Sequence, residues 1–311
     1  MMAPSMSPLV RNRHVFLFVA IYAAALTILL VDGRPLGDVI GAVVILGVLL
    51  PLAALGATMR MPVPTRPKPW QRSEVPVLLG LVAWIVVFLL VKGPLLAALL
   101  PADPDPRLEE SVNTLLKLLA FVLVPWLVLC RHGLGGSQAG RPVASKSRLL
   151  IAFFVVALAG FAVQALLGSQ FKRLLTGDYT TLQIALGGTL CFVWMSLEAG
   201  LVEEFFFRWF LQSRLAAWAG SEISGIFLGA LIFGLAHAPG ILLRGAGAIE
   251  GLGDSPGVAT TLSYVIATQG VAGLTFGVLW SRTRSLVLIV ALHGFIDALS
   301  NTASFIDTWW S

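Results

Sequence analysis

The sequence predicts an all-α, polytopic helical membrane protein with about nine transmembrane helices. Its 311 residues are 57% hydrophobic and only 12% charged, with a mean hydropathy of +0.89, whereas a soluble domain carries about 25% charged residues. Apolar runs recur along the whole chain, and each is close to the roughly 20 residues that a helix needs to cross a bilayer. We expect helices because an isolated strand cannot satisfy its backbone hydrogen bonds in lipid.

The apolar runs define the spans in order. The first run follows Arg11 and Arg13; its length, and the absence of a small-x-small cleavage site after it, predict a retained span rather than a cleaved signal peptide. Cys130 and Cys191 fall inside apolar runs and indicate neither a disulfide nor a metal framework. The predicted spans are 15–31, 36–58, 75–91, 111–130, 149–168, 182–207, 222–243, 258–280 and 286–306.

Basic residues in alternate loops predict a cytoplasmic N-terminus. With that orientation, 13 Lys and Arg residues fall in cytoplasmic segments and six in outside loops, as the positive-inside rule requires. The C-terminus is then outside, where Trp309 and Trp310 form an aromatic anchor at the interface. Lys117 lies close enough to a span end to extend its amine toward the headgroups. Because the net charge of +5 is spread over short loops, nothing indicates a nucleic-acid partner.

Two connecting segments divide the chain. The segment 131–148 is rich in Gly and Ser, carries four basic residues and no acid, and predicts a flexible cytoplasmic linker. It separates an N-terminal transmembrane region of four spans, 1–148, from a second region, 149–311. The proline-rich segment 101–110 predicts a rigid external loop. We find no internal repeat, which weighs against a secondary transporter.

The most unusual stretch is 198–212, where the two adjacent carboxylates Glu203 and Glu204 lie beside three phenylalanines. A charged side chain at mid-bilayer costs roughly 2.5 kcal/mol or more. Glu204 and Arg208 are four residues apart, so they share a helix face and can pair. Glu203 is rotated by about 100° and points elsewhere. One carboxylate is thus neutralised while its neighbour stays free to act, although the stretch alone fits a solvated helix end equally well.

Two further polar pairs follow on later spans. Phe233 and His237, and then His293 and Asp297, are each four residues apart and therefore share a helix face. At 1.5 Å per residue, Glu203 and these three polar residues lie roughly 13 to 22 Å from their inner helix ends. Because each would be costly against lipid, we expect them to face one another or a wet cavity.

This set of residues suits the activation of water. A carboxylate in an apolar pocket can act as a general base, while histidines and an aspartate orient the water or hold an oxyanion. The same residues could instead bind zinc with one open position. Serine chemistry is disfavoured because the chain has no G-x-S-x-G motif. Glu198, Gln164, Gln269 and Asn301 are also polar and within spans, and each alone is typical of hydrogen bonding between helices.

The ordered motifs Glu203-Glu204-x-x-x-Arg208, Phe233-x-x-x-His237 and His293-x-x-x-Asp297 resemble those of the CPBP family. That family contains the CAAX prenyl endopeptidases and bacterial Abi-type proteins. The resemblance covers about 182–306, so it implies that 149–311 is a CPBP-like intramembrane peptidase core.

The resemblance also implies roles for these residues. It suggests Glu203 as the base that activates water and His237 as its assistant, and it places His293 and Asp297 at the oxyanion or substrate carbonyl. Glu204, Arg208 and Phe233 become supporting residues. It further implies a site that opens toward the cytosol and a location in the bacterial inner (plasma) membrane. Trp209 departs from the family, which often has Gly there.

The predicted function is therefore an intramembrane endopeptidase that cleaves a membrane-associated protein or peptide. We favour glutamate-type chemistry without a metal or other cofactor, and zinc remains the alternative. The rival functions that would use the same polar pocket are a non-enzymatic immunity or scaffold protein and an ion-coupled transporter. The sequence does not identify the substrate.

Overall fold

The computed structural model describes residues 13–135, 144–244 and 257–310. Within these ranges every regular element is a helix, and nine helices are long and apolar enough to cross a membrane. The predicted all-α fold with about nine spans is therefore confirmed. The predictions that concern Arg11, Arg141 and the central part of the 131–148 linker lie outside the described residues.

Each predicted span corresponds to one helical rod, and several rods are built from consecutive segments. The short helix α9 (Ser169–Thr176) connects the fifth rod to the sixth. The nine rods are α2 (Arg13–Val31); α3 (Leu36–Gly41), η1 (Ala42–Leu49) and α4 (Leu50–Thr58); η2 (Arg72–Glu74) and α5 (Val75–Leu99); α6 (Pro106–Leu118), η3 (Leu119–Leu123) and α7 (Val124–Arg131); α8 (Lys146–Leu167); α10 (Thr181–Met195), η5 (Ser196–Leu201), η6 (Glu204–Gln212) and α11 (Ser213–Ala219); α12 (Glu222–Ala236) and α13 (Ala238–Arg244); α14 (Val258–Val265), η7 (Ile266–Gly270) and α15 (Val271–Thr283); and α16 (Leu286–Trp310).

The external loop predicted at 101–110 is shorter than expected, because α6 already begins at Pro106. The side chain of Asp105 accepts a hydrogen bond from the backbone N–H of Arg107 at 2.7 Å, which caps the helix. Proline is well suited to the first helical position because its missing N–H would have no partner there. The helix start therefore moves into the charged segment that the sequence pattern assigned to the loop.

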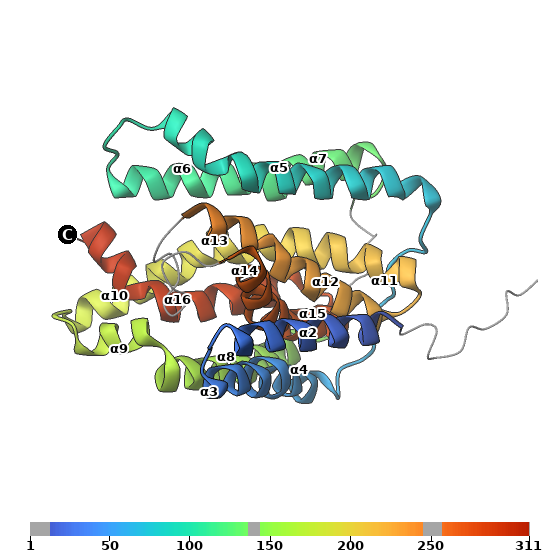
Figure 1. Cartoon of the computed structure of the whole chain (residues 1–311), viewed down its shortest axis with the longest axis horizontal. Helices are drawn as coiled ribbons and strands as arrows, with labels where there is room; N and C mark the ends of the chain where they lie inside the picture. The colour runs from blue at the N-terminus through green and yellow to red at the C-terminus, as the bar shows by residue number, and fades with distance from the viewer. Residues whose placement is uncertain (1–12, 136–143, 245–256, 311) are drawn as a thin grey trace, which may run out of the picture.

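The rod formed by α14, η7 and α15 is the most enclosed. Of its most apolar window, 72% is buried, compared with 22% for α2 and for α8. Figure 1 shows α5, α6 and α7 along one side of the molecule, and α2, α3, α4 and α8 along the other. The later helices of the second region, from α10 to α16, lie between these two layers, with α4 packed against α8 and α15, and α2 against α12 and α14. The boundary at residue 148 stays a prediction, since the two regions share these contacts.

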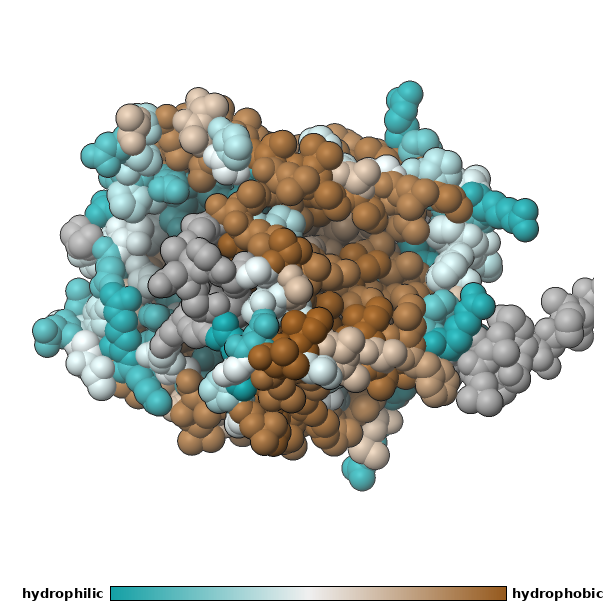
Figure 2. All heavy atoms as spheres, viewed as in Figure 1, coloured by the Kyte–Doolittle hydropathy of each residue, from teal (hydrophilic) through white to brown (hydrophobic). Residues whose placement is uncertain are grey.

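The outer surface is that of a multi-pass membrane protein. Large apolar side chains such as Phe16, Val31, Leu158 and Val287 are exposed. Figure 2 shows apolar side chains gathered across the middle of the visible face and hydrophilic ones at its two ends. An apolar belt of this kind excludes a soluble protein, because soluble monomers rarely expose apolar patches above a few hundred Å².

Candidate active site

The two adjacent glutamates have different surroundings. They lie where the sixth rod changes to the π-helical segment η6, a backbone form often found at functional sites. The side chain of Glu203 is 21% exposed, whereas that of Glu204 is fully buried. The two side chains therefore lie in different surroundings, as their rotation about the helix predicted.

Glu204 belongs to a buried cluster with Arg208. The Nε atom of Arg208 lies 3.4 Å from Oε2 of Glu204, and the guanidinium lies over the ring of Phe233, 3.9 Å from its centroid. Gly273 provides space for both groups, since a β-carbon there would lie 3.1 Å from the Phe233 ring and 3.2 Å from Arg208 Nη2. The three supporting residues expected from the sequence therefore form one packed unit.

His293 connects this buried cluster to Glu203. Its Nδ1 lies 2.8 Å from Oε1 of Glu204, and because a carboxylate only accepts, Nδ1–H is the donor. The ring stacks on Phe276 with the centroids 4.8 Å apart. Held in this way, Nε2 lies 3.7 Å from Oε2 of Glu203 and 3.4 Å from Oδ2 of Asp297. Partners that fix one ring nitrogen determine what the other can do.

His237 approaches Glu203 from the opposite side. It follows the last residue of α12, and Pro239 opposes continuation of that helix. Its Nδ1 lies 2.9 Å from the carbonyl oxygen of Phe233, so Nδ1–H is the donor here too. Nε2 is then 3.9 Å from Oε1 of Glu203. The Glu203 carboxylate therefore faces one histidine with each oxygen, beyond direct hydrogen-bond distance but within reach through a water molecule.

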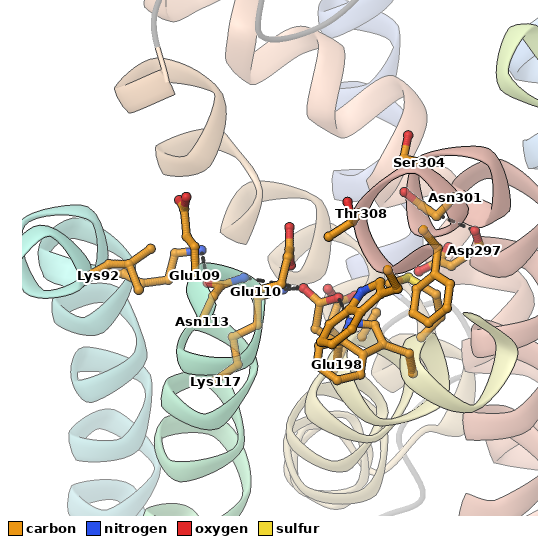
Figure 3. A pocket seen from close by; sticks show the side chains of 17 residues that line it. Lys92, Glu109, Glu110, Asn113, Lys117, Glu198, Asp297, Asn301, Ser304 and Thr308 are labelled. Atoms are coloured by element: carbon orange, nitrogen blue, oxygen red, sulfur yellow. Dashed lines mark hydrogen bonds and ion pairs between the residues drawn. The ribbon is translucent and has the colours of Figure 1, made fainter. Parts of the chain in front are cut away.

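A cavity of about 530 Å³ reaches this centre and is bordered there by Glu203 and Asp297. Its walls come from α5, α6, α10, η5 and α16. Figure 3 shows side chains from both sides of the cavity, with Lys92, Asn113 and Lys117 opposite Asp297. The two histidines are not part of the wall. A substrate in the cavity would therefore meet Glu203 and Asp297 before either histidine.

Glu198 links several residues of the cavity wall, and the sequence predicted that it would form hydrogen bonds between helices. Glu198 accepts from Lys117 Nζ at 2.8 Å, from Asn113 Nδ2 at 3.4 Å and from Trp194 Nε1 at 3.1 Å. The prediction that Lys117 extends toward the headgroups is wrong, because its amine pairs with this buried carboxylate instead. The ion pair offsets the free-energy cost of keeping the charged amine away from water.

A metal site is not evident in the part of the chain that the structure describes. There, no three His, Cys, Asp or Glu side chains come together as potential ligands of one ion. The Glu203 carboxylate lies 3.9 Å from Nε2 of His237 and 3.7 Å from Nε2 of His293.

Sequence patterns missed several residues of the site. Phe276 carries no polar signal that would have distinguished it from a packing residue, and Lys92 in α5 and Asn113 in α6 lie outside the recognised motifs. The sequence did offer one signal for the helix that carries Phe276. Gly273 and Gly277 are four residues apart, and small residues at that spacing allow close contact between helices.

We predict that Gly294→Ala will displace His293. A β-carbon at Gly294 would lie 2.6 Å from the Cα of Ser196 in η5, so α16 must shift. Overpacking of this kind typically costs 1–3 kcal/mol, so the thermal unfolding midpoint should fall.

The matched control is Gly188→Ala at the contact between α10 and α16. There the nearest atoms, on Thr302, lie 3.9 Å away, so the alanine fits. Equal behaviour of the two variants would contradict the close approach at Gly294.

Part of the chain matches a known family. The family model described as type II CAAX prenyl endopeptidase Rce1-like matches residues 185–299. No curated protein and no solved structure matches the chain. The match confirms the resemblance inferred from the three motifs, and it includes Glu203, His237, His293 and Asp297.

Proposed function

We propose that this chain is a CAAX-type intramembrane protease, because residues 185–299 match the Rce1-like family model, and that Glu203 activates water for peptide-bond hydrolysis. The substrate is a membrane-associated protein or peptide. The observation that carries the proposal is the position of Glu203, whose carboxylate borders the cavity and faces Nε2 of His237 and of His293.

The reaction requires two proton transfers. Glu203 takes a proton from water as the water oxygen bonds to the carbonyl carbon, and then gives it to the nitrogen that leaves when the C–N bond breaks. His237, with Nδ1–H donated to Phe233, has Nε2 available to accept a hydrogen bond from the water. His293 and Asp297 face the place where the oxyanion forms; His293 Nε2 supplies a donor when the ring is protonated.

Glu204 and Arg208 act through His293 rather than on the substrate. The Nδ1–H donated to Glu204 fixes the ring, and the Arg208 guanidinium balances the buried carboxylate. Side chains that orient a reacting imidazole in this way hold it in one tautomer and one direction.

The proposal extends to location and partners. The basic loops support a cytoplasmic N-terminus, and the resemblance supports a bacterial inner (plasma) membrane. The partners are the lipid bilayer and the substrate, without nucleic acid.

The test is a comparison of peptide ends. Cells that carry the wild type are compared with cells that carry Glu203→Gln at equal expression, and new termini are sought among membrane and secreted peptides. Ends that need the wild-type residue identify both the activity and the substrate. Identical peptide ends, together with a phenotype lost only on deletion, would refute the protease and support the binding or transport alternatives.

We predict that activity does not depend on a metal. Purified protein that has been stripped with a chelator should cleave the identified peptide at the rate of untreated protein, because Glu203 itself takes the proton. The control adds zinc to the stripped protein. Loss of activity on stripping and recovery with zinc would instead support the metal mechanism.

A further inference from the structure

The two ends of the helical bundle differ in basic charge. One end contains the loops between the second and third, fourth and fifth, sixth and seventh, and eighth and ninth rods, together with the start of α2. Among the described residues it carries 11 Lys and Arg, namely Arg13, Arg60, Arg66, Lys68, Arg72, Arg131, Lys146, Arg148, Arg214, Arg282 and Arg284. The opposite end carries six, namely Arg34, Lys92, Arg107, Lys172, Arg173 and Arg244. The positive-inside rule places the first end in the cytoplasm.

The cavity that reaches Glu203 lies toward the end with fewer basic residues. Its wall includes Lys92 near the end of α5, Glu109 and Glu110 near the beginning of α6, and Thr308 near the end of α16. All of these helix ends lie on the side opposite the basic loops. In Figure 3 the labelled residues of α6 and α16 occupy both sides of this space.

Eleven of the 17 residues that line the cavity are polar or charged, and the other six are Leu96, Trp194, Met195, Ala199, Phe305 and Trp309. The wall contains the amines of Lys92 and Lys117 and the carboxylates of Glu109, Glu110 and Glu198, besides the two at the reactive centre. An apolar chain placed here would desolvate charged groups without replacing their hydrogen bonds, which is unfavourable. A peptide backbone with polar side chains can replace those bonds.

We infer that the substrate reaches Glu203 from the extracytoplasmic side, as a polar peptide segment rather than a lipid-modified one. This inference rests on the proposed protease function. It assigns a role to the third and fourth spans, whose helices α5 and α6 lie outside the family match yet form one wall of the cavity.

The inference departs from the cytosolic opening that the family resemblance implies. A cytosolic opening and the positive-inside rule cannot both hold for this chain. If the cavity opened to the cytosol, the end with 11 basic residues would lie outside and the end with six would lie inside. The cavity and the charge distribution are features of this chain itself, so we base the inferred orientation on them.

Thiol labelling in intact cells tests the inference without requiring proteolysis. Cys130 and Cys191 are replaced by serine, and a single cysteine is introduced as Ser304→Cys in the cavity wall, where the native serine is exposed. A sulfonated maleimide, which does not cross membranes, should label it equally before and after permeabilisation. The matched control is Ser147→Cys, an exposed position at the basic end, which should be labelled only after permeabilisation.

Two results would overturn the inference. In the first, Ser304→Cys is labelled only after permeabilisation while Ser147→Cys is labelled in intact cells. In the second, Ser304→Cys is labelled under neither condition. The same labelling in a Glu203→Gln background separates access from catalysis, so absence of cleavage with the expected labelling would count against the protease and not against the route.

The peptide ends give a second readout on the chemistry of the substrate. Cleavage sites should lie in extracytoplasmic segments with polar residues next to the broken bond. Sites next to a lipid-modified residue or in cytoplasmic segments would contradict the inference.

Discussion

Glu203→Gln is expected to lower the cleavage rate by about 10²–10⁴-fold, the usual contribution of a general base. Glutamine keeps the shape of the side chain but cannot take the proton. The nearest histidine nitrogens are 3.7 and 3.9 Å from the carboxylate, so no direct hydrogen bond is lost and the thermal unfolding midpoint should stay unchanged. The measurement is the rate on the identified peptide with purified protein.

The control is Asp178→Asn, an exposed carboxylate in the connection between α9 and α10. It removes one negative charge from a residue that does not line the cavity, and it should leave the rate as in the wild type. Cleavage at the wild-type rate in Glu203→Gln would refute the assignment of the base.

Arg208→Ala is expected to have the largest effect on stability. The side chain is fully buried with Glu204, and it also lies over Phe233. Its removal leaves a buried carboxylate without its cation, which typically costs 3–5 kcal/mol. The cleavage rate should fall as well, because the same carboxylate holds His293. Thermal unfolding in detergent measures the first effect.

Arg173→Ala is the matched control for the loss of an arginine ion pair. Arg173 pairs with Asp307, and their side chains are 50% and 43% exposed. Exposed pairs contribute about 0–1 kcal/mol, so the unfolding midpoint should change little. An Arg208→Ala protein as stable as Arg173→Ala would contradict the buried cluster.

Most of the features that the sequence predicted correctly depend on short distances along one helix. The spans follow from continuous apolar runs. The pairing of Glu204 with Arg208 follows from their spacing. Glu203, His237 and His293 lie together because buried polar groups on separate helices must find partners. Their catalytic roles remain predictions.

The features that escaped the sequence depend on contacts between distant helices. Lys117 and Glu198 are 81 residues apart and meet only because α6 packs against η5. The cavity needs α5 and α6, which carry none of the recognised motifs. Phe276 stacks on His293 from α15, which carries none of the recognised motifs. No local pattern encodes such contacts.

The central claim is that Glu203 and His237 act on one water molecule. Cleavage rates of Glu203→Asp, His237→Ala and the double variant test it most directly, since both single changes should leave measurable activity. Residues that act as a unit give strongly non-additive losses. We predict that the double variant is about as slow as the slower single variant, whereas losses that multiply would show that the two residues act independently and would contradict the account.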